Sequence, residues 1–270
     1  MSASLPGRLW LVGAGNMGGA MLERWLAGGV FRPDQLLVID PGAKTLPAGV
    51  ARVDAAPEGE SPDILLLAIK PQLLDAVAPT LATCRPGLLV SILAGVEAAT
   101  IAARIPAATI VRAMPNLPVS LGQGVVALHS DAADTPARDT AEALMAPLGL
   151  VEWLDDETLF HAVTALSGSG PGFVYRFIAA LAEGGATLGL PADQAQRFAV
   201  TTVEGAAALA SASGATPDAL ADRVASPGGT TRAGLDVLDD GDAIRRLVAA
   251  TLTAAARRSE ELADAAKGAA

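Results

Sequence analysis

Two stretches in the second half of the chain place hydroxyl and glycine residues where a small anion could bind. Ser226–Gly229 (Ser-Pro-Gly-Gly) interrupts an alanine-rich helical sequence, and Thr230 and Thr231 stand where a new helix should begin. The unpaired N–H groups at a helix N-terminus attract carboxylates and phosphates. Ser167–Pro171 (Ser-Gly-Ser-Gly-Pro) is predicted to be a second loop of this kind, ahead of a long helix from about Gly172. Each stretch alone also fits a plain connection between helices.

A phosphate-binding turn is predicted near the N-terminus, where the chain reads Gly13-Ala14-Gly15-Asn16-Met17-Gly18. This G-x-G-x-x-G motif follows an apolar strand and opens a helix, which is the context that a dinucleotide site requires. Gly13 permits the tight turn, Gly15 lets the backbone approach a pyrophosphate, and Gly18 lets the helix and strand pack closely. An ordinary strand–helix turn with three glycines is the plainer alternative.

Asp40 ends the second predicted strand, roughly 20 residues beyond the glycines, where an acidic side chain accepts hydrogen bonds from ribose hydroxyls. Its charge would repel a 2′-phosphate, so it favours NAD(H), although Lys44 nearby weakens this argument. Asp40 could instead only form the turn before Pro41.

Three more candidates lie at the carboxyl ends of predicted strands, the edge at which open α/β sheets bind ligands. They are Ala68–Pro71, Leu93–Gly95 and Arg112–Asn116. We expect Lys70 beside the cofactor and the Asn116 amide near the nicotinamide or substrate. The candidate cofactor residues from these three segments are Ala68, Ile69, Lys70, Pro71, Ala94, Gly95 and Asn116.

Apolar strand-like runs alternate with helices as far as residue 157, which predicts a parallel sheet covered on both faces. From residue 158 onward the sequence is helical and rich in alanine. We therefore expect two domains, 1–157 and 158–270. Helices that are apolar over most of their surface require burial, so the second domain is expected to pack against another subunit.

Composition excludes several classes of function. The net charge of −10 argues against a nucleic-acid partner. The single cysteine, Cys84, cannot form an internal disulfide, and two histidines, His129 and His161, offer no metal-ligand spacing, so no metal is expected. No signal peptide or membrane-spanning run of roughly 20 apolar residues is evident, which predicts a cytoplasmic protein without a membrane partner. The chemistry should therefore come from a bound cofactor.

Five motifs together resemble those of pyrroline-5-carboxylate reductases, in the same order along nearly the whole chain. They are GAGNMG at 13–18, AIKP at 68–71, RAMPN at 112–116, SGSGP at 167–171 and SPGGTT at 226–231. The resemblance implies an α/β fold with an N-terminal Rossmann-type domain and a C-terminal all-helical dimerisation domain. It also implies reduction of the cyclic imine 1-pyrroline-5-carboxylate to L-proline, the last step of proline biosynthesis, by a homodimer or a larger ring of dimers.

The same resemblance implies how the small-molecule substrate is bound. The Thr231 hydroxyl would face the ring nitrogen as the catalytic group. The other expected substrate-binding residues are Ser226, Gly228, Gly229, Thr230 and Ser169. The family commonly uses NADP(H), whereas Asp40 favours NAD(H). The chain also has Pro171-Gly172-Phe173 where the family commonly has Pro-Ala-Tyr, so a tyrosine hydroxyl is lost.

Two rival functions remain open from the sequence. A β-hydroxyacid-dehydrogenase-like reductase shares the glycine motif, but that chemistry usually needs a lysine in the helical half, where only Lys267 occurs. A non-catalytic dinucleotide-binding scaffold that senses redox state is the other.

Overall fold

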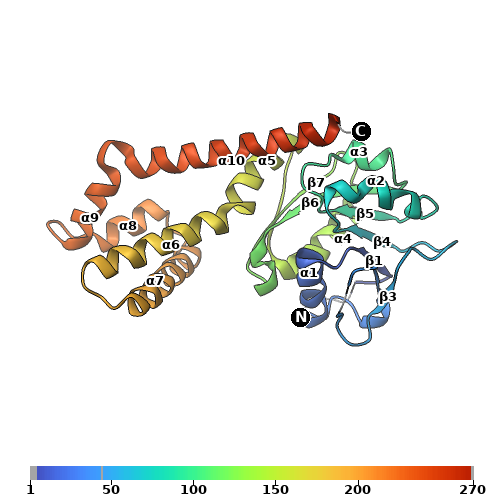
Figure 1. Cartoon of the computed structure of the whole chain (residues 1–270), viewed down its shortest axis with the longest axis horizontal. Helices are drawn as coiled ribbons and strands as arrows, with labels where there is room; N and C mark the ends of the chain where they lie inside the picture. Colours follow the sequence, from blue (N-terminus) through green and yellow to red (C-terminus); the bar gives the residue numbers. More distant parts are fainter. Residues whose placement is uncertain (1–4, 44, 269–270) are drawn as a thin grey trace. The chain divides into compact units, whose positions relative to one another are not determined.

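Short apolar segments form one sheet in the first part of the chain. The computed structural model describes residues 5–43 and 45–268, with side chains as far as Asp264. Within these residues the sheet has the order β3-β2-β1-β4-β5-β6-β7-β8 (Figure 1). The strands are β1 (Leu9–Val12), β2 (Leu36–Ile39), β3 (Ala51–Val53), β4 (Ile64–Leu67), β5 (Leu88–Ser91), β6 (Thr109–Pro115), β7 (Gly124–His129) and β8 (Gly149–Trp153).

The sheet is parallel except for one pair, so the prediction of a parallel sheet needs a correction. β6 and β7 run antiparallel, with Arg112 opposite His129 and Pro115 opposite Val126. A parallel return needs a crossover of a dozen or more residues, and the segment from Pro115 to Gly124 is too short for one. The sequence did not predict strands β3 and β8, which pair in parallel with β2 and β7.

Helices cover both faces of this sheet. They are α1 (Asn16–Ala27), α2 (Leu74–Val77), α3 (Ala98–Ala102), α4 (Thr135–Met145) and α5 (Phe160–Val163), followed by a π-helix (Thr164–Gly168). Short 3-10 segments are η1 (Pro33–Gln35), η2 (Pro71–Leu73), η3 (Ala78–Leu81), η4 (Leu117–Leu121), η5 (Ala146–Leu148) and η6 (Glu157–Leu159). The segment after Pro71 is divided into η2, α2 and η3, and α2 ends before Pro79, which lacks the N–H that a continuing helix would need.

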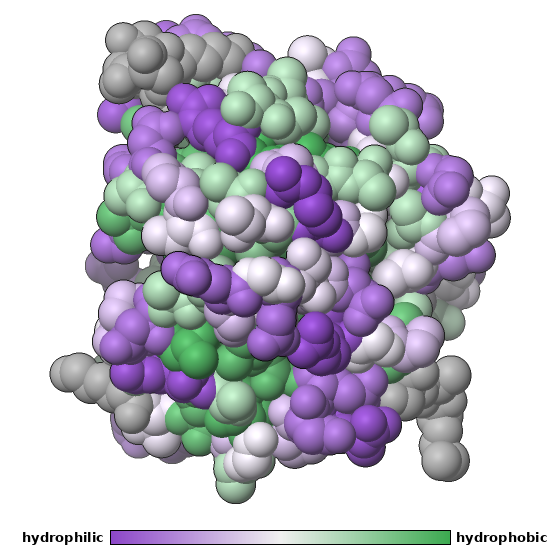
Figure 2. Space-filling model, turned by 90° about the vertical axis from the view of Figure 1, so that its right-hand side faces the viewer, coloured by the Kyte–Doolittle hydropathy of each residue, from purple (hydrophilic) through white to green (hydrophobic). Residues whose placement is uncertain are grey.

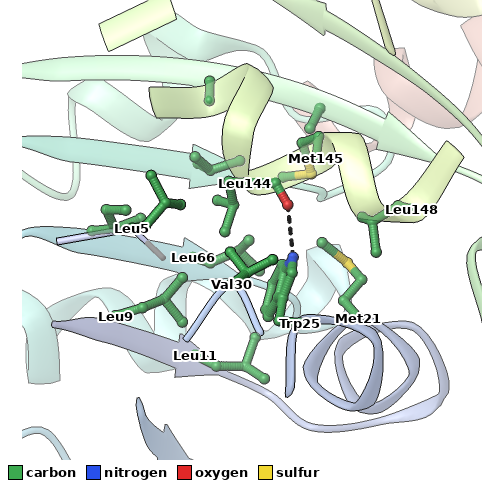
Figure 3. Close-up of a cluster of buried hydrophobic side chains, with 14 of the residues drawn as sticks. Leu5, Leu9, Leu11, Met21, Trp25, Val30, Leu66, Leu144, Met145 and Leu148 are labelled. Carbon is green, nitrogen blue, oxygen red and sulfur yellow. Dashed lines mark hydrogen bonds between the residues drawn. The ribbon is translucent and has the colours of Figure 1, made fainter. Parts of the chain in front are cut away.

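The core has two layers because successive strand residues point to opposite faces. Leu9 and Leu11 of β1 pack with α1 and α4, whereas Trp10 and Val12 pack with α2 and α3. Figure 3 shows the first layer, where the buried indole Nε1 of Trp25 donates a hydrogen bond of 2.7 Å to the Leu144 carbonyl oxygen. This bond ties α1 to α4 and satisfies the one polar atom that the side chain brings into the core.

The remaining helices are α6 (Gly170–Thr187), α7 (Ala192–Ser213), α8 (Pro217–Val224), α9 (Thr230–Asp239) and α10 (Ala243–Gly268), with η8 (Asp240–Asp242) before the last. The chain divides into two compact units. The sheet unit runs to Gly168 and resumes at Ala256, and the helical unit is Ser169–Ala255, so the long helix α10 contributes to both. The expected domains 1–157 and 158–270 are a different division and stay a prediction.

Candidate functional site

The turn after β1 has a shape that suits a dinucleotide phosphate. Gly13 has a φ of +93°, and a Cβ there would lie 2.8 Å from the Ala68 carbonyl oxygen. A side chain on Gly18 would collide with the Gly13 carbonyl oxygen. At Gly15, by contrast, no described atom beyond its neighbours lies within 4 Å of a Cβ position. Two glycines thus make the turn tight, and the third leaves its backbone open to a ligand.

The N-terminus of α1 adds hydrogen-bond donors to this turn. Gly15 is the N-cap, and no side chain in the described residues caps the helix. The first N–H groups, which include those of Asn16 and Met17, have no acceptor inside the helix. These donors and the positive end of the helix dipole suit the phosphates of a dinucleotide. The residues of this turn therefore fit the expected cofactor.

Asp40 follows β2 and is held against the glycine turn. Its Oδ2 accepts a hydrogen bond of 2.8 Å from the Ala14 N–H, and its Oδ1 accepts one of 2.8 Å from the Gly42 N–H. The second bond is the turn-forming role that the sequence left open, and the first fixes a negative charge beside the glycine motif. Each carboxylate oxygen keeps a lone pair for a further donor.

Arg52 lies beside the loop that follows Asp40, and the sequence reading missed it. Its Nη1 donates to the Ala43 carbonyl oxygen at 2.7 Å, and its Nη2 lies 2.9 Å from Asp54 Oδ1. Arg52 is on β3, opposite Val38 of β2. A cation here opposes the charge of Asp40. Arg52 comes close to this loop only through the pairing of β3 with β2, which the sequence analysis did not predict. Lys44, weighed above for the same role, lies outside the described residues.

The other expected cofactor residues gather at one edge of the sheet. Ala68–Pro71 follows β4, Ala94 and Gly95 follow β5, and Asn116 follows β6. These strands are neighbours and parallel, so their carboxyl ends meet. The Ala68 N–H donates to the Val12 carbonyl oxygen, which joins this edge to the glycine turn. Gly95 has a φ of +74°, as its tight turn requires.

The Asn116 amide is engaged within the protein. Its Oδ1 accepts from the Val125 N–H at 2.8 Å, and its Nδ2 donates to the Ser167 carbonyl oxygen at 2.9 Å. The residue is 7% exposed. Direct contact between this amide and a nicotinamide stays a prediction.

A small cavity of about 70 Å³ lies near this edge of the sheet unit. The buried Arg112 forms an ion pair of 2.8 Å with Glu157 and stacks on the Phe160 ring at 4.4 Å. His161 Nδ1 lies 3.0 Å from the hydroxyl of Ser259, so α5 is braced against the last turns of α10. Two of the charged side chains that line this cavity, Arg112 and Glu157, are thus paired with each other.

The Ser167–Pro171 stretch is helical, and the prediction of a loop is wrong. The π-helix ends at Gly168, Ser169 is the N-cap of α6, and Pro171 stands in its first turn. Proline is tolerated there because its missing N–H would have no partner inside the helix. The glycines and the proline of this stretch predicted a loop because both residue types disfavour the interior of a helix. In the structure they lie at the end of the π-helix and in the first turn of α6, where a helix accepts both. Substrate binding by Ser169 stays a prediction.

The second stretch is the tight turn and helix start that the sequence predicts. The Gly229 N–H donates to the Ser226 carbonyl oxygen at 2.9 Å, with Pro227 and Gly228 between them. Gly228 has a φ of +70°, so the residues fit a type II turn. A Cβ on Gly229 would lie 2.5 Å from the Ser226 hydroxyl oxygen. The turn therefore requires Gly228 for its positive φ, and at Gly229 a side chain would crowd Ser226.

The N-terminus of α9 follows directly from this turn. α9 begins at Thr230, and no side chain in the described residues caps it. Arg232 in its first turn forms an ion pair of 2.7 Å with Asp222 of α8, a hydrogen bond that raises the pKa of the guanidinium. The ion pair joins the first turn of α9 to α8. The N–H groups of Thr230 and Thr231 have no acceptor inside the helix and remain available as donors.

Comparisons with known proteins match two separate parts of the chain to family models. Residues 157–262 match a family described as pyrroline-5-carboxylate reductase dimerisation, and residues 8–95 match one described as NADP oxidoreductase, coenzyme F420-dependent. The pyrroline-5-carboxylate reductase of Synechocystis sp. is 39% identical over 264 residues, which cover 94% of this chain and 98% of that protein. The chain belongs to the pyrroline-5-carboxylate reductase family.

Other family members support this membership. The pyrroline-5-carboxylate reductase of Pseudomonas aeruginosa is 36% identical over 267 residues, covering 95% of this chain and 97% of that protein. A solved structure of a pyrroline-5-carboxylate reductase from Coxiella burnetii superposes with a TM-score of 0.87 at 31% identity, covering 95% of this chain and 98% of the other.

Membership in the pyrroline-5-carboxylate reductase family confirms the predicted fold class and oxidoreductase activity. The sheet unit is the Rossmann-type part, the cofactor is NADP(H) or NAD(H), and the helical part is a dimerisation domain. No helix in residues 5–43 and 45–268 is long and apolar enough to span a membrane. Nor do those residues contain a group of three or more side chains suited to hold a metal ion. The individual site residues stay predictions.

Proposed function

We propose that this protein reduces 1-pyrroline-5-carboxylate to L-proline. The observation that carries the proposal is family membership together with an intact glycine turn and an uncapped helix start at Thr230. NAD(P)H, when bound, supplies the hydride. The imine carbon accepts the hydride and the ring nitrogen takes up a proton, so the C=N bond becomes a single bond and NAD(P)⁺ is released.

The residues that we propose for the substrate lie around the start of α9. The Ser226 hydroxyl and the backbone N–H groups of Gly228 and Thr230 would hold the carboxylate, because the helix N-terminus offers N–H donors and a positive dipole end. The backbone of Gly229 would line the same site, while its N–H donates to the Ser226 carbonyl oxygen. The Thr231 hydroxyl would donate a hydrogen bond to the ring nitrogen. Most of the rate acceleration then comes from orientation, since the imine carbon is already electrophilic and a hydrogen bond to the nitrogen lone pair polarises the C=N bond further.

For the cofactor we propose the glycine turn for the pyrophosphate and the strand ends for the nicotinamide half. Asp40 favours NAD(H), because a 2′-phosphate would meet a carboxylate fixed by the Ala14 N–H. Arg52 works against this preference, but part of its charge is already used by Asp54. We therefore expect NADH to react faster than NADPH, with both accepted.

We further propose that the working form is at least a homodimer built through the helical unit. The match to a dimerisation family supports this, and so do the large apolar side chains that the single chain leaves exposed. The cytoplasmic location and the lack of a nucleic-acid partner stay predictions, which cell fractionation and a binding assay with DNA and RNA would check.

The test is direct. Purified protein is mixed with pyrroline-5-carboxylate, and the absorbance of NADH and of NADPH is followed in separate assays. We expect rapid oxidation that needs both reactants and yields proline. A folded protein that binds the dinucleotide but turns over neither cofactor would contradict the proposal and would favour the redox-sensing scaffold.

A further inference from the structure

Asn116 joins three segments of the sheet unit through one side chain. It directly follows β6, its Oδ1 accepts from the N–H of Val125 at the start of β7, and its Nδ2 donates to the Ser167 carbonyl oxygen in the π-helix. The network settles the orientation of the amide, because one partner is a donor and the other an acceptor. A buried amide in this setting acts as a cross-link between the sheet edge and the π-helix.

The Ser167 carbonyl has a specific need for this donor. In an α-helix it would accept from the N–H four residues later, but Pro171 has none. The next N–H, that of Gly172, already donates to the Ser169 carbonyl oxygen at 2.9 Å. Ser167 is half-buried, and a carbonyl removed from water and left without a partner is destabilising by up to about 1–3 kcal/mol. Asn116 supplies the bond that Pro171 removes.

The turn that Asn116 holds is also packed tightly against β6. A Cβ on Gly168 would lie 3.1 Å from the terminal methyl carbon of Met114. Gly168 is the last residue of the sheet unit before the chain continues into α6. The end of the π-helix is therefore held to the end of β6 by the Asn116 bond, with little room for a side chain on Gly168.

We infer that Asn116 is a positioning residue of the reductase, which acts through the Ser167 carbonyl rather than by touching cofactor or substrate. It fixes the π-helix relative to the sheet edge at which we place the nicotinamide. This inference rests on the proposed function. A small displacement of such a segment lowers the rate of hydride transfer more than it lowers binding, because the rate depends on the alignment of the reacting atoms.

Asn116→Asp is the sharpest variant, because it is isosteric and keeps an oxygen to accept from Val125. Its other oxygen cannot donate to Ser167 while the carboxyl is ionised. We expect kcat to fall by about ten- to a hundredfold near pH 8, with KM for both reactants nearly unchanged. Burial raises the pKa of such a carboxyl. As pH is lowered through that pKa, the protonated group donates again and kcat should recover relative to wild type.

Gln35→Glu is the matched control. Gln35 is also a buried amide of the sheet unit, and its Nε2 donates to the carbonyl oxygens of Leu5 and Gly7. It precedes β2, so it lies at the amino ends of the parallel strands, whereas Asn116 lies at their carboxyl ends. The same chemical change there should lower Tm and leave kcat and its pH profile as in wild type. Asn116→Asp with wild-type kcat at pH 8, or with a loss confined to cofactor affinity, would overturn the inference.

A double variant covers the case in which Asn116→Asp folds poorly. Pro171→Ala introduces an N–H four residues after Ser167, so it should restore part of the stability and kcat that Asn116→Asp loses. A double variant no better than Asn116→Asp would show that Ser167 is not the group through which Asn116 acts.

Hydrogen exchange separates this inference from the proposed function. The amides of residues 164–173 should exchange faster in Asn116→Asp than in wild type, and Gln35→Glu should leave them unchanged. This readout needs no turnover. Failure of the wild type to reduce the imine would contradict the proposed function. Unchanged exchange at residues 164–173 in Asn116→Asp would overturn the positioning role of Asn116, whatever the result of the activity assay.

Discussion

The sheet unit and the helical unit bury their apolar residues to very different extents. In the sheet unit, large side chains such as Trp10, Trp25 and Leu66 are almost fully buried. Figure 2 shows a face of this unit on which hydrophilic residues are mixed with pale ones and hydrophobic residues gather in one patch. In the helical unit, the buried residues among those described are only the alanines Ala195, Ala199 and Ala225.

Large apolar side chains of the helical unit are left exposed instead. They include Val174, Tyr175, Phe177, Leu181, Phe198, Val200, Leu209, Val237, Leu247 and Val248. A soluble monomer rarely exposes so much apolar surface. The difference teaches that the sheet unit carries its own core, whereas the helical unit leaves its large apolar side chains for the second copy that we propose.

The largest expected effect comes from breaking that second core. Phe177 on α6 is 48% exposed in the single chain. Phe177→Glu would bury a charge without a partner in the dimer, so we expect dissociation and about a hundredfold loss of activity. Leu150→Glu is the control, since Leu150 on β8 is 57% exposed in the sheet unit. Sedimentation analysis and kcat measure both, and a Phe177→Glu protein that stays associated and active would refute the comparison.

A change inside the sheet unit should act on the cofactor alone. Gly18→Ala sets a methyl group against the Gly13 carbonyl oxygen, and we expect about a thirtyfold rise in the Kd for NADH with the dimer intact. Gly19→Ala is a close control, because a Cβ there makes an ordinary contact of 3.4 Å with the Ala14 carbonyl oxygen. Fluorescence titration with NADH measures the difference. Equal Kd values for the two variants would contradict the assigned role of Gly18.

Asp40→Ser tests the adenosine side of the same unit. Without the carboxylate, the ratio of kcat/KM for NADPH to that for NADH should rise by about tenfold. Asp34→Ser removes an exposed acid at the other end of β2 and should leave the ratio unchanged. An unaltered ratio in Asp40→Ser would show that Asp40 only shapes its turn.

The smallest effect is expected in the helical unit, at Thr231. Thr231→Ala removes the hydrogen bond that we propose to the ring nitrogen, so kcat should fall by about three- to tenfold with the oligomer unchanged. Thr231→Ser keeps the hydroxyl and should retain most of the activity. Steady-state kinetics decide this, and wild-type kcat in Thr231→Ala would remove the hydroxyl from the mechanism.

The sequence predicted those features that depend on local pattern. Apolar runs revealed most strands, the spacing around Gly15 revealed the tight turn between β1 and α1, and the glycines at 228 and 229 revealed the turn before α9. The direction of β7 was missed because it depends on the length of a connection rather than on the residues of the strand. The loop expected at Ser167–Pro171 was wrong because proline breaks a helix only beyond its first turn.

Features made by residues far apart in the chain were out of reach. Arg52 lies near Asp40 only because β3 pairs with β2. The bond between Asn116 and Ser167 spans 51 positions. A single sequence contains both partners, but nothing in it shows that they meet.

The last turns of α10 have a consequence for how this protein can be divided. Ser259 bonds to His161, and Ala263 lies against the turn at Gly95, where a Cβ would approach its Cα to 3.4 Å. The chain thus leaves its first folding module and later returns to complete it. An excised fragment ending at Gly168 would lack one wall of its own cavity, so a separately expressed nucleotide-binding fragment should also carry residues 256–264.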